Sequence, residues 1–91
     1  MNFDITTDEW TEVENLTDNK TYLIQAKQVQ NLVFYKNYVD VNMLFAQGAD
    51  APDDDKTGIL ASAVKFKKVS GTKVFIRPVG VPVNIEVQEV A

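Results

Sequence analysis

Hydrophobic and polar residues alternate along most of the chain, and the alternation is most regular near the C-terminal end. In the segment VPVNIEVQEV, residues 81–90, aliphatic residues occupy every second position from 81 to 87, and polar residues stand at 84, 86 and 88. Successive side chains of an extended strand point to opposite faces, so this spacing gathers the aliphatic residues on one face. The pattern predicts a half-buried β-strand.

Five further segments have the character of strands. Four of them alternate in the same way, and the fifth, NLVFY at 31–35, is apolar on both faces. The alternating segments are KTYLIQAK at 20–27, YVDVNMLFA at 38–46, AVKFKKV at 63–69 and KVFIRPV at 73–79. Gly71 supplies a turn between the last two, which predicts a hairpin with Lys65 and Lys67 on its outer face.

The spacing of strands and turns defines the expected fold class. About seven or eight short antiparallel strands, with turn signals roughly every 8 to 12 residues, favour an all-β protein: a single β-sandwich or small barrel, with a jelly-roll-like arrangement among the candidates. Nothing divides the chain, so residues 1–91 are expected to form one domain, in which residues 1–9 could be a less regular N-terminal arm. Thr6 and Glu9 match a capping box, which favours one helical turn before Trp10.

The aromatic residues fall into two groups. The first fits one buried face and is expected in the core: Trp10, Tyr22, Phe45 and Phe66. The second is harder to bury within a thin domain: Phe34, Tyr35, Tyr38 and Phe75. Strands that are apolar on both faces need cover on both faces, so a partner subunit could cover this second group; scattered exposed apolar groups are equally ordinary.

Composition narrows the chemistry that the chain can perform. The 91 residues include no histidine and no cysteine, which excludes Ser/His/Asp and Cys/His catalysis, disulfides and thiolate zinc sites. No glycine-rich phosphate loop occurs, and the acids fall in turns or on polar strand faces, so no enzyme activity and no cofactor are expected. The acidic N-terminal segment lacks the features of a signal peptide, and no apolar run approaches the roughly 20 residues of a membrane span, so we expect cytoplasmic synthesis and no membrane partner.

The segment GADAPDDDKTG, residues 48–58, is a candidate cation site. It carries four carboxylates, those of Asp50, Asp53, Asp54 and Asp55, between turn-forming proline and glycine residues. Three of the acids are consecutive, and neighbouring side chains diverge instead of converging on one ion. The sequence therefore favours a solvated turn, with weak calcium binding and an expression-tag remnant as the alternatives.

Charge is distributed unevenly along the chain, whose net charge is −4. Residues 1–19 carry six acids and no base, whereas residues 56–85 carry six bases and no acid. The acidic segment could pair with the basic one on a neighbouring subunit, or the two could pair within one chain. The acidic total opposes nucleic-acid binding, and lysines are common on edge strands, so no nucleic-acid partner is expected.

Several short elements, taken in order, resemble small β-rich virion proteins of tailed bacteriophages, of the decoration or head-fibre type. These elements are Trp10, YLIQ at 22–25, AP at 51–52 before the acids, GIL at 58–60, VFIR at 74–77 and VNIEVQE at 83–89. The resemblance implies a structural protein, located in the virion, that assembles as a symmetric homo-oligomer such as a trimer and docks onto phage capsid or tail proteins.

The candidate oligomer or docking interface combines the surplus aromatics with the basic residues. Its members are Phe34, Tyr35, Tyr38, Phe75, Lys65, Lys67 and Arg77. An alternative function is a carbohydrate- or receptor-binding β-module of a tail fibre, with Tyr35, Tyr38 or Trp10 as an aromatic platform. A third is an acidic inhibitor that mimics nucleic acid, although the basic segment interrupts the acidic stripe that such a protein needs.

Overall fold

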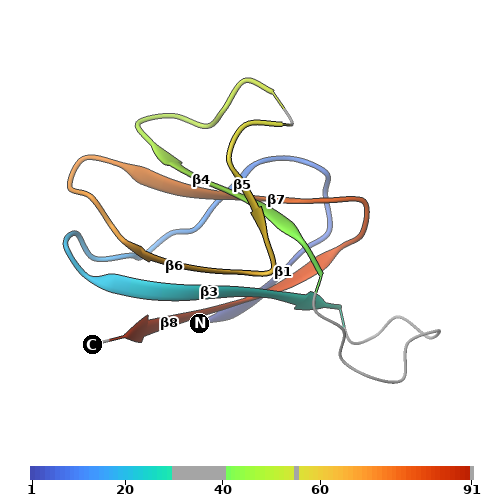
Figure 1. Ribbon diagram of the computed structural model, residues 1–91, viewed down its shortest axis with the longest axis horizontal. Coiled ribbons are helices and arrows are strands. Elements are labelled where there is room, and N and C mark those ends of the chain that lie inside the picture. Colours follow the sequence, from blue (N-terminus) through green and yellow to red (C-terminus); the bar gives the residue numbers. More distant parts are fainter. Residues whose placement is uncertain (30–40, 55, 91) are drawn as a thin grey trace.

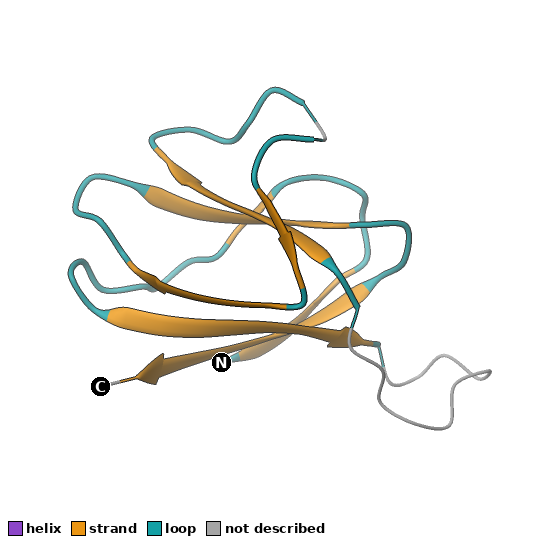
Figure 2. Ribbon diagram, viewed as in Figure 1, coloured by secondary structure: helices purple, strands orange, loops and turns teal. Residues whose placement is uncertain are grey.

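The computed structural model describes residues 1–29, 41–54 and 56–90, and these form eight β-strands with no helix among them (Figure 2). The strands are β1 (Asn2–Ile5), β2 (Thr11–Glu12), β3 (Thr21–Gln28), β4 (Met43–Gly48), β5 (Ile59–Ala61), β6 (Ala63–Lys67), β7 (Lys73–Pro78) and β8 (Val83–Val90). The prediction of an all-β protein with seven or eight short strands is confirmed.

The eight strands form two four-stranded antiparallel sheets that pack face to face (Figure 1). The first sheet has the order β1-β8-β3-β6, and the second has the order β2-β7-β4-β5. Strand pairs β1–β8, β2–β7, β3–β6 and β4–β5 are those of one long antiparallel hairpin, folded at the β4–β5 loop. Rolling that hairpin up brings β8 beside β3 and β7 beside β4, which gives an eight-stranded jelly roll.

The core lies between the two sheets and follows the alternation of the sequence. In β3 the residues Tyr22, Ile24 and Ala26 are buried while their neighbours are only partly covered, and in β8 the same holds for alternate residues from Val83 to Val87. The largest fully buried side chains come from both sheets: Ile24, Met43, Ile76, Ile85, Val74 and Val83. Each such aliphatic side chain contributes about 1.5–3 kcal/mol by leaving water, so this layer holds the two sheets together.

Three aromatic rings link the sheets at one side of the core. Phe66 of β6 lies with its ring centroid 4.8 Å from that of Phe45 in β4 and 5.9 Å from that of Tyr22 in β3. The Tyr22 hydroxyl accepts a hydrogen bond from the Thr17 backbone N–H at 2.8 Å, so its polar end is satisfied at the rim. These three residues confirm three of the four predicted core aromatics.

Trp10, the fourth predicted core aromatic, does not belong to the buried core. Its side chain is partly exposed, and its indole Nε1 donates to the backbone oxygen of Asp54 at 2.6 Å. The helical turn expected before it is also absent, because residues 7–9 form bends. The expected N-terminal arm is regular over Asn2–Ile5, where β1 pairs with β8.

The predicted hairpin of 63–69 with 73–79 is wrong, although both segments contain strands. The turn at Gly71 exists, with a positive φ of 81° and a hydrogen bond of 3.1 Å from Thr72 N to Val69 O. The chain nevertheless crosses there from one sheet to the other, so that β6 pairs with β3 and β7 pairs with β4 and β2. A turn signal fixes where the chain reverses, whereas the rolled hairpin decides which strands become neighbours. The predicted strand at 31–35 lies outside the described residues.

Gly58 is the glycine on which the β4–β5 turn depends most. Its φ is +113°, and a Cβ atom placed there would stand 2.5 Å from the backbone oxygen of Phe45, which is too close for any side chain. Gly80 also has a positive φ, of +80°, but nothing lies within 4 Å of the corresponding position. The two glycines therefore separate the effect of backbone strain from that of collision with β4.

We predict that Gly58→Ala destabilises the protein by more than about 2 kcal/mol, because collision adds to a backbone strain of about 1–3 kcal/mol. Gly80→Ala, the matched control, should cost only about 1–2 kcal/mol, since it carries strain alone. Urea denaturation of the two variants and the wild type measures the difference. Equal losses for the two variants would contradict the collision of residue 58 with Phe45.

Candidate interaction surface

The edge strands of the two sheets differ in whether they carry charge. The charged residues of the edge strands are Asp4 in β1, Glu12 in β2, and Lys65 and Lys67 in β6. β5, the remaining edge strand of the described sandwich, has the sequence ILA and carries no charge. Its Ile59 and Leu60 are 55% and 59% exposed, although an exposed apolar edge is normally protected by charge.

A groove lies next to this edge, between β5 and β6. The two strands meet at Ser62, where the chain passes from the second sheet to the first, and they diverge from that corner (Figure 1). The corner is held by a hydrogen bond of 2.8 Å from Ala26 N to Ser62 O. The groove has a volume of about 460 Å³, and its lining comes from β4, β5, β6 and the end of the β4–β5 loop: Phe45, Ala46, Gln47, Thr57, Gly58, Ile59, Val64, Lys65 and Phe66.

The end of the groove away from Ser62 is fixed by Gln47. Its Oε1 accepts hydrogen bonds from Val69 N at 2.8 Å and from the Thr72 hydroxyl at 2.9 Å. Its Nε2 donates to Lys67 O at 3.4 Å. One side chain of the second sheet therefore anchors the β6–β7 connection to β4.

The acidic residues of segment 48–58 lie on the β4–β5 loop, whose conformation is stabilised by one carboxylate, that of Asp54. Asp54 Oδ1 accepts from the backbone N–H of Lys56 at 2.9 Å and of Thr57 at 2.7 Å, while Oδ2 accepts from the Thr57 hydroxyl at 2.9 Å. This is the way an aspartate stabilises a turn, through local bonds to the following backbone. The two Lys56 and Thr57 N–H bonds, with the Thr57 hydroxyl, hold the pKa of Asp54 below its ordinary value.

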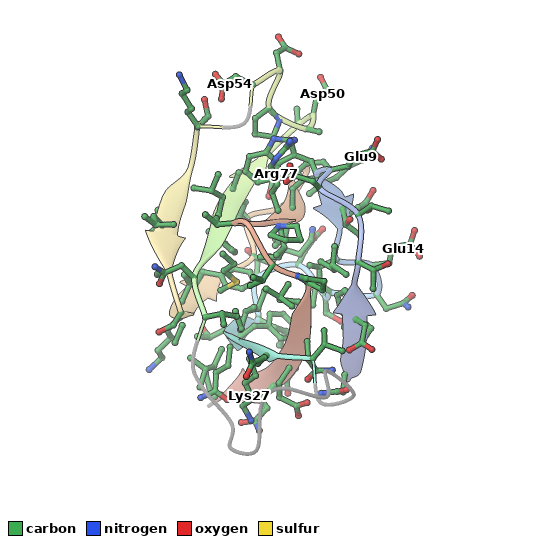
Figure 3. The ribbon with its side chains drawn as sticks, turned by 90° about the vertical axis from the view of Figure 1, so that its right-hand side faces the viewer. Glu9, Glu14, Lys27, Asp50, Asp54 and Arg77 are labelled. Carbon is green, nitrogen blue, oxygen red and sulfur yellow. The ribbon has the colours of Figure 1, made fainter. Side chains whose placement is uncertain are left out.

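The loop is also tied to the N-terminal part of the chain through Trp10. The indole donates to Asp54 O, and its ring edge comes within 3.5 Å of the position that a Cβ atom on Gly58 would take. Figure 3 shows Asp50 and Asp54 at the end of the molecule opposite Lys27. Among the described residues, which omit Asp55, no group of three or more acids lies close enough together to hold a metal ion. The solvated-turn interpretation thus has a specific structural basis in Asp54.

Charges of the acidic N-terminal segment pair with the basic segment inside the same chain. Lys68 Nζ contacts a carboxylate oxygen of Asp18, and Arg77 Nε lies 3.5 Å from Asp8 Oδ1. The Lys68 hydrogen bond, joined by one from Ser70, holds the pKa of Asp18 below its ordinary value. The sequence left open whether these two segments pair within one chain or between neighbouring subunits. The Lys68–Asp18 and Arg77–Asp8 contacts lie within one chain.

The two lysines of the predicted interface have a different environment. Lys65 and Lys67 are exposed on the outer face of β6, as expected, and within the described part of the chain neither forms an ion pair. Arg77 lies on β7 with its side chain largely covered and directed to Asp8. The basic residues of the predicted interface therefore do not form one patch.

Of the four aromatics of the predicted interface, Phe75 is the one that lies among the described residues. Phe75 is only 7% exposed, so the single chain already covers this ring, contrary to the expectation that a partner would be needed. Its register partner is Ala46, and Gly58 follows on the same outer face of the second sheet, where the indole of Trp10 lies. Trp10 thus belongs to the outer cover of that sheet. Phe34, Tyr35 and Tyr38 lie outside the described residues.

A polar ladder occupies the opposite outer face, on β1 and β8. The Asn2 side chain donates to Asn84 at 2.7 Å and to Glu86 at 2.8 Å, and Asn84 donates to Asp4 at 2.7 Å. The hydrogen bond from Asn2 holds the pKa of Glu86 below its ordinary value. These side chains satisfy one another, so this face offers bonded polar groups where β5 offers apolar ones.

The described residues define a small jelly-roll β-sandwich with one uncharged open edge. Comparison of the chain with protein-family models, with curated proteins and with solved structures found no match. None of the described segments forms a helix long and apolar enough to cross a membrane.

Sequence reasoning missed Ile59 and Leu60, although a signal for them exists. The eight residues from 57 to 64, TGILASAV, contain no charge, in contrast to the lysines that follow. This signal alone does not distinguish an edge strand from a central one, because β4 is equally uncharged over Met43–Gly48. The topology was needed to place the uncharged run at an edge.

We predict that Thr57→Val raises the pKa of Asp54 toward its ordinary value, because it removes the hydroxyl donor. The pKa of Asp54 is lowered in the folded state, so the stability that it contributes is complete above the ordinary value of about 3.9 and is lost as the pH falls through the lowered one. Carboxyl chemical shifts followed during an NMR pH titration measure the change. Thr57→Ser, which keeps the hydroxyl, should leave the pKa low, and Asp18 should titrate unchanged in both variants.

Proposed function

We propose that the protein is a non-enzymatic structural component of a bacteriophage virion, a capsid decoration or head- or tail-associated protein that acts by self-assembly and docking. The observation that carries the proposal is the open β5 edge, with Ile59 and Leu60 exposed beside a groove whose lining is partly aromatic. Such a surface suits contact with another protein, because apolar area removed from water supplies most of the free energy of association.

The sequence elements that resemble phage virion proteins suggest that the contact is made on a phage particle. The fold is compatible with this role but does not select it, since jelly rolls serve in viral capsids, in lectins and in cupins alike. The proposal therefore combines a surface suited to protein contact with a resemblance that suggests where the contact is made.

Lys65 and Lys67 supply the charge for docking onto an acidic partner surface. They stand on β6 beside the groove, and the exposed acids Asp50, Asp53 and Asp54 stand on the loop at its other side. Charges at the rim of an interface chiefly steer approach and fix orientation, while apolar contacts provide the affinity. Docking should accordingly be slower at high salt.

Trp10 gives no support to the alternative of a carbohydrate platform. A sugar-binding aromatic presents its ring face to the ligand, whereas this indole is partly buried and uses its Nε1 in the bond to Asp54 O. The other two aromatics of that hypothesis, Tyr35 and Tyr38, lie outside the described residues.

The direct test is the presence of the protein in purified particles. We expect mass spectrometry of density-purified virions, from cells in which the gene is expressed during phage growth, to find the chain in many copies per particle. A matched sample from a phage with the gene deleted is the control. Abundant protein in the infected cells together with its absence from the particles would contradict the proposal.

A further inference from the structure

We propose that β5 is the self-association site of this protein, where it pairs antiparallel with β5 of a second copy about a twofold axis. The inference rests on the self-assembly part of the proposed function and specifies its surface and symmetry. The joined sheet would run without interruption from β2 of one copy, through the two β5 strands, to β2 of the other.

The first support is the contrast between β5 and the other edges. An edge strand presents unpaired backbone N–H and C=O groups, and charged residues on it discourage pairing with other chains. Asp4, Glu12 and the β6 lysines provide that protection on three edges, and β5 lacks it. Within the described residues, its backbone is paired with β4 on one side and with no strand on the other.

The second support is the apolar match that the pairing creates. Leu60 pairs with Leu44 within the chain, so the two side chains share the outer face of the second sheet. An antiparallel pair centred on Leu60 places this residue opposite its own copy, and Ile59 opposite Ala61. Four leucines then form one row across the joined sheet, and the two residues that are more than half exposed become covered.

The third support is the place of the acidic loop, which favours one direction of pairing. The exposed Asp50, Asp53 and Asp54 lie on the β4–β5 loop, at the N-terminal end of β5. An antiparallel pair puts the loops of the two copies at opposite ends of the paired strands, whereas a parallel pair would place them side by side and bring like charges together.

The symmetry follows from the geometry of the contact. An antiparallel pair of identical strands uses the same patch on both subunits, which is an isologous twofold contact and closes with two copies. A trimer, which the phage resemblance suggested, needs a head-to-tail contact between two different patches. The mass of the oligomer in solution therefore discriminates between the two arrangements.

The first experiment exploits the absence of cysteine from the chain. In Leu60→Cys the two introduced thiols would face each other across the twofold axis, within the Cα separation of about 4.4–6.8 Å that a disulfide requires. We expect mild oxidation to convert most of this variant to a covalent dimer. Val69→Cys is the matched control, because Val69 is 54% exposed and lies outside β5, and it should crosslink far more slowly. Equal rates for the two variants would overturn the proposal.

The second experiment measures mass by sedimentation and light scattering. We expect the wild type to be a dimer at about 0.1 mM, a concentration that saturates a micromolar association. Leu60→Lys should raise the dimer dissociation constant at least about tenfold, because it removes apolar burial and places like charges opposite each other. Val69→Lys should remain a dimer, and an unchanged melting temperature and circular dichroism spectrum would show that the Leu60 variant is folded.

The remaining outcomes separate this inference from the proposed function. A wild type that is monomeric at about 0.1 mM, or a trimer that Leu60→Lys leaves intact, overturns pairing through β5. Neither result bears on whether the chain is found in virions. Conversely, a Leu60-dependent dimer that is absent from purified particles would support the pairing and contradict the virion role.

Discussion

The structure depends above all on the burial of one apolar layer between two four-stranded sheets. That layer is built from every second residue of β3, β4, β7 and β8, so it demands a fixed register in each strand. A slip by one residue would turn Ile24 or Ile85 toward water and place polar neighbours such as Gln25 or Glu86 inside. The chain has no disulfide to compensate, and its stability therefore comes chiefly from this layer and from the hydrogen bonds of the two sheets.

The folding of the long hairpin into two sheets also determines which strand edges stay exposed. Rolling up a long hairpin leaves β5 and β6 at adjoining edges, joined at Ser62 and separated elsewhere by the groove beside Phe45 and Phe66. Charges are then distributed according to their place in the fold. Asp8 and Asp18 pair with Arg77 and Lys68 inside the chain, and Asp54 stabilises its own loop, while the β5 edge keeps an apolar character.

Much of the fold could be predicted from the sequence, because a period of two identifies faces. It placed Tyr22, Ile24 and Ala26 inside and Lys65 outside, and it gave the strand count. The alternation could not identify which strands pair, since β6 satisfies the same pattern beside β3 as beside β7. The candidate interaction surface was harder to predict for the same reason: Ile59 and Leu60 matter only because the topology puts them at a sheet edge. Trp10 lies outside the buried core because its indole bonds to the β4–β5 loop, and Phe75 is covered within the single chain; no periodicity predicts either.

The most direct test of the whole account is backbone amide hydrogen exchange measured at low and high protein concentration. The account predicts that the central strands β3, β8, β4 and β7 exchange slowly at both concentrations, because they carry the buried layer. It also predicts that the β5 amides that point away from β4 exchange quickly in dilute solution and gain protection on concentration, while the outward amides of β1 and β2 do not. Rapid exchange in β3 and β8, or outward β5 amides whose exchange is independent of concentration, would contradict it.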